Sequence, residues 1–132
     1  MAAFEAKEFA QAWQLLRPIA EKGNAQAQHR LAIMCQNGLG MVKNDMMAFK
    51  WMQSAADQGY ALAQHGLGFM YLYGECTERN PLKAIEWLRR AAEQGMTGSQ
   101  MTLGMIYEQG LGVEKDEEQA RKWYQMAESA PH

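Results

Sequence analysis

The feature that most constrains this chain is a period of 36 residues. Residues 60–95 recur on both sides of themselves after a shift by 36 positions, and the alignment needs no gap in either direction. The positions that keep their character are Leu31/Leu67/Leu103, Met34/Met70/Ile106, Gly38/Gly74/Gly110, Ala48/Ala84/Ala120, Trp51/Trp87/Trp123 and Ala55/Ala91/Ala127. A fixed period of about 20 to 50 residues is the signature of a repeat architecture. The sequence therefore predicts a stack of similar units.

Each full unit has the pattern of two helices, which we call helix A and helix B. Helix A is expected over residues 24–37, 60–73 and 96–109. Each of these segments ends at a glycine, which closes a last helical turn without strain. Helix B is expected to start after Asn44, Asn80 and Asp116, because such side chains accept bonds from the free N–H groups at a helix start.

The chain divides into a half-unit and three full units within one domain, residues 1–132. The expected boundaries are 1–23, 24–59, 60–95 and 96–130. In the half-unit we expect a stub at Ala2–Lys7 and then helix B over Glu8–Lys22, kinked near Pro18 because proline removes a backbone bond.

The last unit differs from the others at two positions of helix B. Met46 and Leu82 become Glu118, and Phe49 and Ile85 become Arg121. These positions are expected to face the following unit. Polar replacements there are typical of a terminal capping unit, so we expect the solenoid to end within this chain.

Small side chains predict a close approach of helices A and B. They are Ala27/Ala63/Ser99 and Ala32/Gly68/Gly104. The tryptophans recur once per unit among alanines, so we expect Trp51, Trp87 and Trp123 to be buried structural residues and not part of a ligand site.

Composition excludes several partner classes. The net charge is −2 and the isoelectric point is near 5.9, without a basic block, so neither nucleic acid nor an anionic membrane is an expected partner. No segment has the length of a membrane span or the apolar core of a signal peptide. With Cys35 and Cys76 as unpaired thiols, we expect a cytoplasmic protein, or a periplasmic one if Met1 follows a trimmed precursor.

The periodic residues also carry a family resemblance. The middle unit reads Ala61-x-Ala63-Gln64-x-x-Leu67-Gly68-x-Met70-Tyr71-x-x-Gly74, followed by Ala84-x-x-Trp87-Leu88-x-x-Ala91-Ala92-x-x-Gly95. This pattern resembles the Sel-one-like repeat, a relative of the tetratricopeptide repeat. The resemblance implies an all-α fold, a right-handed solenoid of antiparallel helix pairs whose A helices line a concave face. It also implies an adaptor role. Copy two departs from the family in its loop, Glu75-Cys76-Thr77-Glu78.

Catalytic motifs are weak in this sequence. His29 and His65 are equivalent positions, but the third copy has Met101 there, and no cysteine or carboxylate shares a ligand-like spacing with them. Neither cysteine belongs to a CxxC pair, and no serine lies in a nucleophile elbow. We expect no enzyme activity, no metal and no cofactor.

A binding surface is better supported, on the side of helix A that faces away from helix B. Its expected members are His29, Ile33, Leu62, His65, Phe69, Leu72, Tyr73, Met101 and Met105. A contiguous exposed apolar stripe marks an interaction site. In the alternative interpretation, Ile33, Phe69 and Met105 pack against neighbouring A helices.

These observations leave three functional hypotheses. The first is a non-catalytic scaffold or adaptor that binds a protein segment on the concave face. The second is a structural, self-assembling module that dimerises through an N-terminal edge at Phe4, Phe9 and Trp13. Outside this second hypothesis we expect a monomer. The third, a hydrolase, has no supporting cluster of catalytic residues.

Overall fold

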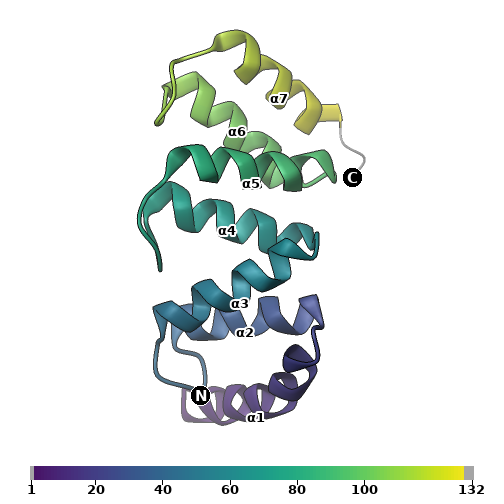
Figure 1. Ribbon diagram of the computed structural model, residues 1–132, viewed down its shortest axis with the longest axis vertical. Coiled ribbons are helices and arrows are strands. Elements are labelled where there is room, and N and C mark those ends of the chain that lie inside the picture. Colours follow the sequence, from purple (N-terminus) through teal and green to yellow (C-terminus); the bar gives the residue numbers. More distant parts are fainter. Residues whose placement is uncertain (1, 130–132) are drawn as a thin grey trace.

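The protein is a linear stack of helices. The computed structural model describes the backbone of residues 2–129 and the side chains of residues 8–129. Within this range there are seven helices and no strand: α1 (Ala2–Glu21), α2 (Ala25–Asn37), α3 (Asp45–Asp57), α4 (Ala61–Tyr73), α5 (Pro81–Glu93), α6 (Thr97–Gln109) and α7 (Glu117–Ser129). They follow one another along the long axis, from α1 at one end to α7 at the other (Figure 1). The predicted all-α solenoid is confirmed. None of the described helices is long and apolar enough to cross a membrane.

The helices alternate between the two predicted types. The A helices are α2, α4 and α6, and the B helices are α1, α3, α5 and α7. The predicted starts of helix B are confirmed, because Asn44, Asn80 and Asp116 each accept a bond from the backbone N–H three residues later. The predicted ends of helix A are confirmed too, since Gly38, Gly74 and Gly110 all adopt a left-handed conformation with φ of 67° to 70°.

Helices A and B of one unit approach closely at the predicted small residues. Gly68 in α4 and Gly104 in α6 are buried. A Cβ at Gly68 would lie 2.6 Å from Cγ of Leu88 in α5, and one at Gly104 would lie 2.7 Å from the ring of Tyr124 in α7. Both distances are shorter than van der Waals contact, so these positions set how near the two helices can lie.

The prediction for the tryptophans is only partly right. Trp87 is buried, but Trp51 and Trp123 are half-buried and pack at the margin of the core. The next residue along helix B fills the interior instead, since Met52 and Leu88 are fully buried. Trp87 occupies the same repeat position and is only 8% exposed, so the burial of this tryptophan differs from unit to unit.

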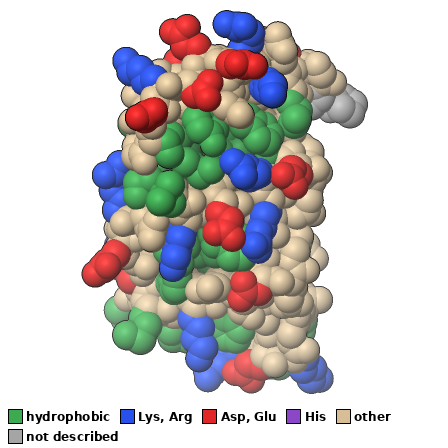
Figure 2. Space-filling model, turned by 45° about the horizontal axis from the view of Figure 1, so that its top comes forward, with side chains coloured by type: hydrophobic (Ala, Val, Ile, Leu, Met, Phe, Trp, Pro, Cys, Tyr) green, Lys and Arg blue, Asp and Glu red, His purple; other side chains and the backbone are tan. Residues whose placement is uncertain are grey.

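The expected contact between units is also only partly right. Ile85 is buried and Phe49 half-buried, but Met46 and Leu82 are 81% and 69% exposed. Glu118 and Arg121 in α7 are exposed as expected. Charged side chains of both signs gather at the C-terminal end of the stack, which comes forward in Figure 2.

The N-terminal half-unit is one helix, where the sequence predicted a stub and a separate helix. α1 runs from Ala2 to Glu21 through Pro18, whose side chain is exposed. Pro18 lies in the last turn, where its carbonyl still accepts a bond from the N–H of Lys22. The expected kink stays a prediction.

A ladder of buried glutamines joins the units, and the sequence analysis did not find it. Gln28, Gln64 and Gln100 are buried, and each donates its side-chain N–H to a carbonyl at the end of the preceding B helix, at 3.0 to 3.3 Å. The side-chain oxygens of the first two accept N–H bonds from Gln58 and Gln94, at 2.9 and 2.8 Å. The glutamines therefore satisfy helix ends that would otherwise be buried without partners.

The first prediction compares two glycines in the same helix. We expect Gly68→Ala to lower the free energy of unfolding by about 1–3 kcal/mol relative to Gly66→Ala, because overpacking against a fully buried Leu88 must displace it. At Gly66 the nearest atoms are the mobile end of Met52, and the gain in helix propensity is the same in both variants. Urea denaturation followed by circular dichroism measures the difference. Equal stability of the two variants would contradict the close approach of α4 and α5.

Candidate functional site

The predicted binding residues come together on one surface, which we call the A-helix face. It consists of His29, Ile33, Leu62, His65, Phe69, Tyr73, Met101 and Met105, from α2, α4 and α6. Ile33, Leu62, Tyr73 and Met101 are exposed, and the other four are half-buried. The face is thus partly accessible. Its role as a binding surface stays a prediction.

Leu72 was predicted to belong to this surface, and that prediction is wrong. Its side chain is only 2% exposed and belongs to the main hydrophobic core. α4 is apolar on nearly all sides, so its periodicity does not show which leucine points inward.

The centre of the A-helix face is a column of three aromatic rings along α4. The centroid of the Phe69 ring lies 4.7 Å from that of His65, edge to face, and 5.7 Å from that of Tyr73, with only 18° between the planes. Residues four apart lie on the same side of a helix, which explains the column. Aromatic rings of this kind form rigid anchors in protein interfaces.

Histidines connect the A helices across this face. The ring of His29 in α2 lies edge to face with that of Tyr60, 5.6 Å between centroids, just before α4. Nδ1 of His65 in α4 lies 2.6 Å from Oγ of Ser99 in α6. The two histidines are equivalent under the 36-residue shift, and each contacts a residue at or near the start of the next A helix, although at different repeat positions.

A pocket of about 420 Å³ opens at the N-terminal end of the face. His29, Ile33 and Leu62 line it together with Phe9 and Leu16 from α1. The sequence analysis did not assign Phe9 and Leu16 to the same site as His29. The sequence did contain a signal for this assignment, because Phe9 and Leu16 lie in an amphipathic helix for which the half-unit was not expected to supply a full helix A.

Burial makes both histidines weak bases. Partial burial lowers the pKa of His65 below its ordinary value of 6.5, and it lowers that of His29 in the same direction, with a smaller contribution from the neighbouring charge of Arg30. Desolvation disfavours the charged imidazolium, so both rings are neutral at pH 7. Among the described residues, no three His, Cys, Asp or Glu side chains are grouped closely enough to hold a metal ion.

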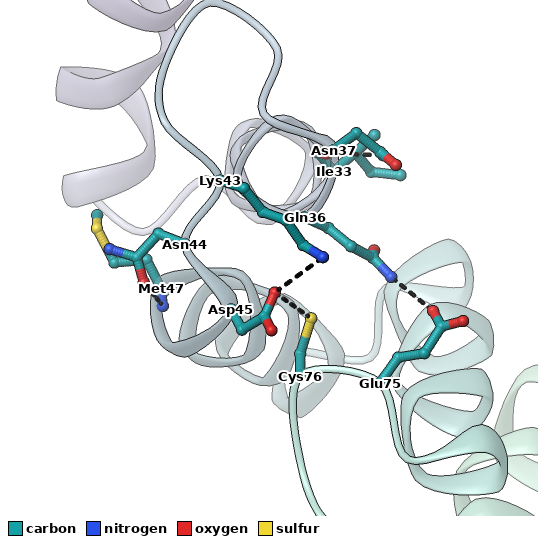
Figure 3. Close-up of polar contacts among 9 residues, drawn as sticks. All are labelled: Ile33, Gln36, Asn37, Lys43, Asn44, Asp45, Met47, Glu75 and Cys76. Atoms are coloured by element: carbon teal, nitrogen blue, oxygen red, sulfur yellow. Dashed lines mark hydrogen bonds and ion pairs between the residues drawn. The ribbon is translucent and has the colours of Figure 1, made fainter.

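Cys76 lies in a polar cluster on the loop after α4, shown in Figure 3. Its thiol donates to Oδ1 of Asp45 at 3.5 Å, and Lys43 Nζ is 3.8 Å from the same oxygen. Gln36 donates to Glu75 at 3.0 Å beside them. Burial and the nearby Asp45 carboxylate raise the pKa of Cys76 to about 11. The thiol is therefore poorly suited to act as a nucleophile.

The residues of the predicted N-terminal edge are partly described. The side chain of Phe4 lies outside those described, and Phe9 and Trp13 are half-buried against the interior. Among the described large apolar side chains of α1, Leu15 and Ile19 are exposed. Dimerisation through this edge stays a prediction.

Comparison with known proteins identifies the repeat. The Sel1 repeat pattern matches three segments, residues 25–60, 61–96 and 98–132. The chain belongs to the Sel1 repeat family. Sel1 repeats commonly serve as protein-interaction modules and are generally non-catalytic. No curated protein sequence matches this chain.

Solved structures of Sel1 repeat proteins have the same fold. One is c5321, a protective antigen of uropathogenic Escherichia coli with an SLR fold, which is 34% identical with a TM-score of 0.85 over 87% of this chain. Another is a Sel1 repeat protein from Oxalobacter formigenes, also 34% identical, with a TM-score of 0.84 over 95% of this chain. The present chain spans 25% and 50% of the lengths of these two proteins.

The lowered pKa of His65 predicts a loss of stability in acid. A histidine whose pKa is lower in the folded state contributes stability that is present above its unfolded pKa, near 6.5, and is lost as the pH falls. Urea denaturation of the wild type should show a lower midpoint at about pH 5 than at about pH 7.5. The decrease in midpoint between these two pH values should be smaller in His65→Gln. If the midpoint of His65→Gln decreased as much as that of the wild type between these pH values, His65 would not be responsible for the loss of stability in acid.

The raised pKa of Cys76 predicts slow alkylation. In a Cys35→Ser background at about pH 8, iodoacetamide should modify folded Cys76 on the order of 100-fold more slowly than a free thiol with a pKa near 8.5. The control is the same protein in denaturant, where Cys76 should react at the ordinary rate. A fast reaction in the folded protein would contradict the hydrogen bond to Asp45.

Proposed function

We propose that this protein is a non-catalytic adaptor that binds a protein segment along the concave face of its A helices. The observation that carries the proposal is the aromatic column of His65, Phe69 and Tyr73, with its outer ring exposed. A stacked pair of rings presents a large apolar surface without losing much side-chain freedom on binding. Such a surface suits the hot spot of an interface.

The surroundings of the column support a peptide-sized partner. Leu62 lies at the start of the same helix, and Met101 on α6 adds a flexible apolar side chain on the next unit. Methionine adapts its shape to the partner. Together with the pocket beside Ile33, these residues form a surface that extends across three units. A groove of this kind fits a helix or an extended peptide.

The polar groups on and near the A-helix face favour binding over catalysis. His29 and His65 are used in contacts between helices, and Cys76 is held as a thiol by burial and Asp45. A nucleophile needs an adjacent base that accepts its proton. Asp45 accepts a bond from Cys76 but raises the pKa of the thiol, which is the opposite of activation.

The test is affinity capture from a lysate of the source organism with wild-type protein, Phe69→Asp and Tyr73→Asp. A charge in the centre of an apolar contact should reduce capture of a specific protein at least tenfold. Tyr73 is exposed, so Tyr73→Asp preserves the fold even if Phe69→Asp does not. The matched control is Leu82→Asp, an exposed apolar residue on a B helix.

Circular dichroism must first show that the variants are as helical as the wild type. Capture that is lost in Tyr73→Asp and retained in Leu82→Asp supports the proposal. Equal capture by all four proteins would place the binding surface elsewhere.

A further inference from the structure

His65 in α4 has a hydrogen-bond partner that its counterpart in α2 lacks. Its Nδ1 lies 2.6 Å from Oγ of Ser99, in the first turn of α6. The 36-residue shift places Ala63 on Ser99, and alanine offers His29 no hydroxyl at that position. A hydrogen bond to the next A helix thus fixes the ring of His65.

The Ser99 hydroxyl decides which ring nitrogen of His65 carries the proton. Ser99 is fully buried, and its hydroxyl has no other hydrogen-bond partner among the described residues. If Nδ1 were the donor, the hydroxyl hydrogen would be buried without an acceptor, which is costly. The hydroxyl therefore donates to Nδ1, and the proton of the neutral ring lies on Nε2.

The Nε2 edge of this ring lies beside an exposed glycine. A Cβ on Gly98 would be 3.3 Å from Cε1 and 3.7 Å from Nε2 of His65. At the corresponding place beside His29 the chain has Leu62. Gly98 therefore carries no side chain over the Nε2–H group, and no acceptor for this group is present among the described residues.

The surroundings of this donor are apolar and uncharged. The Phe69 ring is 4.7 Å from that of His65, and Leu62 and Met101 are exposed apolar side chains of the same face. Burial alone lowers the pKa of His65, so none of the described charged groups acts on the ring. A carboxylate would lose hydration here without gaining a counter-charge, so the acceptor that suits this donor is a neutral carbonyl.

We propose that Nε2–H of His65 binds a main-chain carbonyl of the partner, and that the partner segment is extended where it crosses α4. The proposal rests on the adaptor function proposed above. Carbonyls in the body of an α-helix already accept bonds from their own helix, whereas those of an extended segment are free. Side chains alternate along such a segment, so a residue next to the bound carbonyl can place an apolar side chain on Phe69. Ser99 is a positioning residue, since it acts through the ring of His65.

The first test uses the wild-type protein labelled with nitrogen-15 histidine. Long-range proton–nitrogen correlation spectra at about pH 7.5 distinguish protonated from unprotonated ring nitrogens. We expect His65 to have a protonated Nε2 and an unprotonated Nδ1, with its signals assigned by their loss in His65→Gln. Ser99→Ala should shift the ring towards a mixture of the two tautomers. A proton on Nδ1 of His65 in the wild type would overturn the inference.

The second test uses a defined peptide, selected from a displayed library of random linear peptides on the wild-type protein. Peptides that bind the wild type but not Tyr73→Asp use the A-helix face. A fluorescein-labelled synthetic copy of such a peptide is titrated with each variant by fluorescence anisotropy. His65→Phe/Ser99→Ala should weaken binding about five- to tenfold, because the ring remains, its donor is lost and no buried hydroxyl is left unpaired.

Two comparisons show whether a main-chain carbonyl is involved. His29→Phe is the matched control and should keep the affinity within about twofold, since its ring has no hydroxyl at Ala63 to fix it. Replacing the amides of the peptide by esters, one at a time, weakens each carbonyl as an acceptor. One ester should weaken binding to the wild type and have no effect on His65→Phe/Ser99→Ala.

The outcomes separate this inference from the adaptor function. If no selected peptide depends on Tyr73, the A-helix face does not bind peptides and both proposals fail. If a peptide depends on Tyr73 but binds His65→Phe/Ser99→Ala as tightly as the wild type, only the present inference fails. Equal weakening in His29→Phe would also overturn it, because the two histidines would then act alike. Weaker binding to the double variant, with one sensitive ester, supports it.

Discussion

The close contact between helix A and helix B of one unit is the constraint on which the structure depends. At Gly68 the backbone of α4 lies so near Leu88 that even a methyl group would overlap it. Helices that approach this closely bury each other with alanine, leucine and methionine side chains. Met52 and Leu88 accordingly fill the interior.

A second contact fixes how successive units stack. The loop after each A helix packs against the preceding B helix at an equivalent repeat position. Gly40 meets Phe9 within α1, and Gly112 meets Pro81 at the start of α5, so that a Cβ on either glycine would overlap its neighbour. In the middle unit the corresponding residue is Cys76, which meets Asp45 and adopts the same left-handed conformation with φ of 64°. A non-glycine residue is strained there. The thiol bond to Asp45 offsets part of that cost.

Much of the fold could be predicted because the residues that cap each helix lie next to it in the sequence. Asn80 and Gly74 act through hydrogen bonds within a few residues, so their roles can be recognised in a sequence without knowledge of the tertiary contacts. The glutamine ladder is different. Gln94 and Gln64 are 30 residues apart, and only the stacking of helices brings them together at 2.8 Å.

The candidate site was harder to predict than the fold. The A helices are apolar on several sides, so a shift of one position around the helix changes an exposed residue into a buried one. Leu72 and Tyr73 are adjacent, yet one is in the core and the other is exposed. In the amphipathic helix α5 the polar side marks the outside clearly, but α4 offers no such reference. Binding residues on an apolar helix therefore need the packing partners to be known.

The two ends of the stack expose different kinds of side chain. At the C-terminal end, Glu118 and Arg121 of α7 are exposed, and charged side chains of both signs gather on the surface there (Figure 2). Charged side chains at such positions are typical of a terminal repeat. The glutamine ladder also stops there, because Gln100 Oε1 has no hydrogen-bond partner among the described residues, and the position 36 residues after Gln94 is an alanine. At the other end, Leu15 and Ile19 of α1 are exposed apolar side chains. The two ends of the stack therefore present different surfaces, because α7 exposes charges at the positions compared, whereas α1 exposes large apolar side chains.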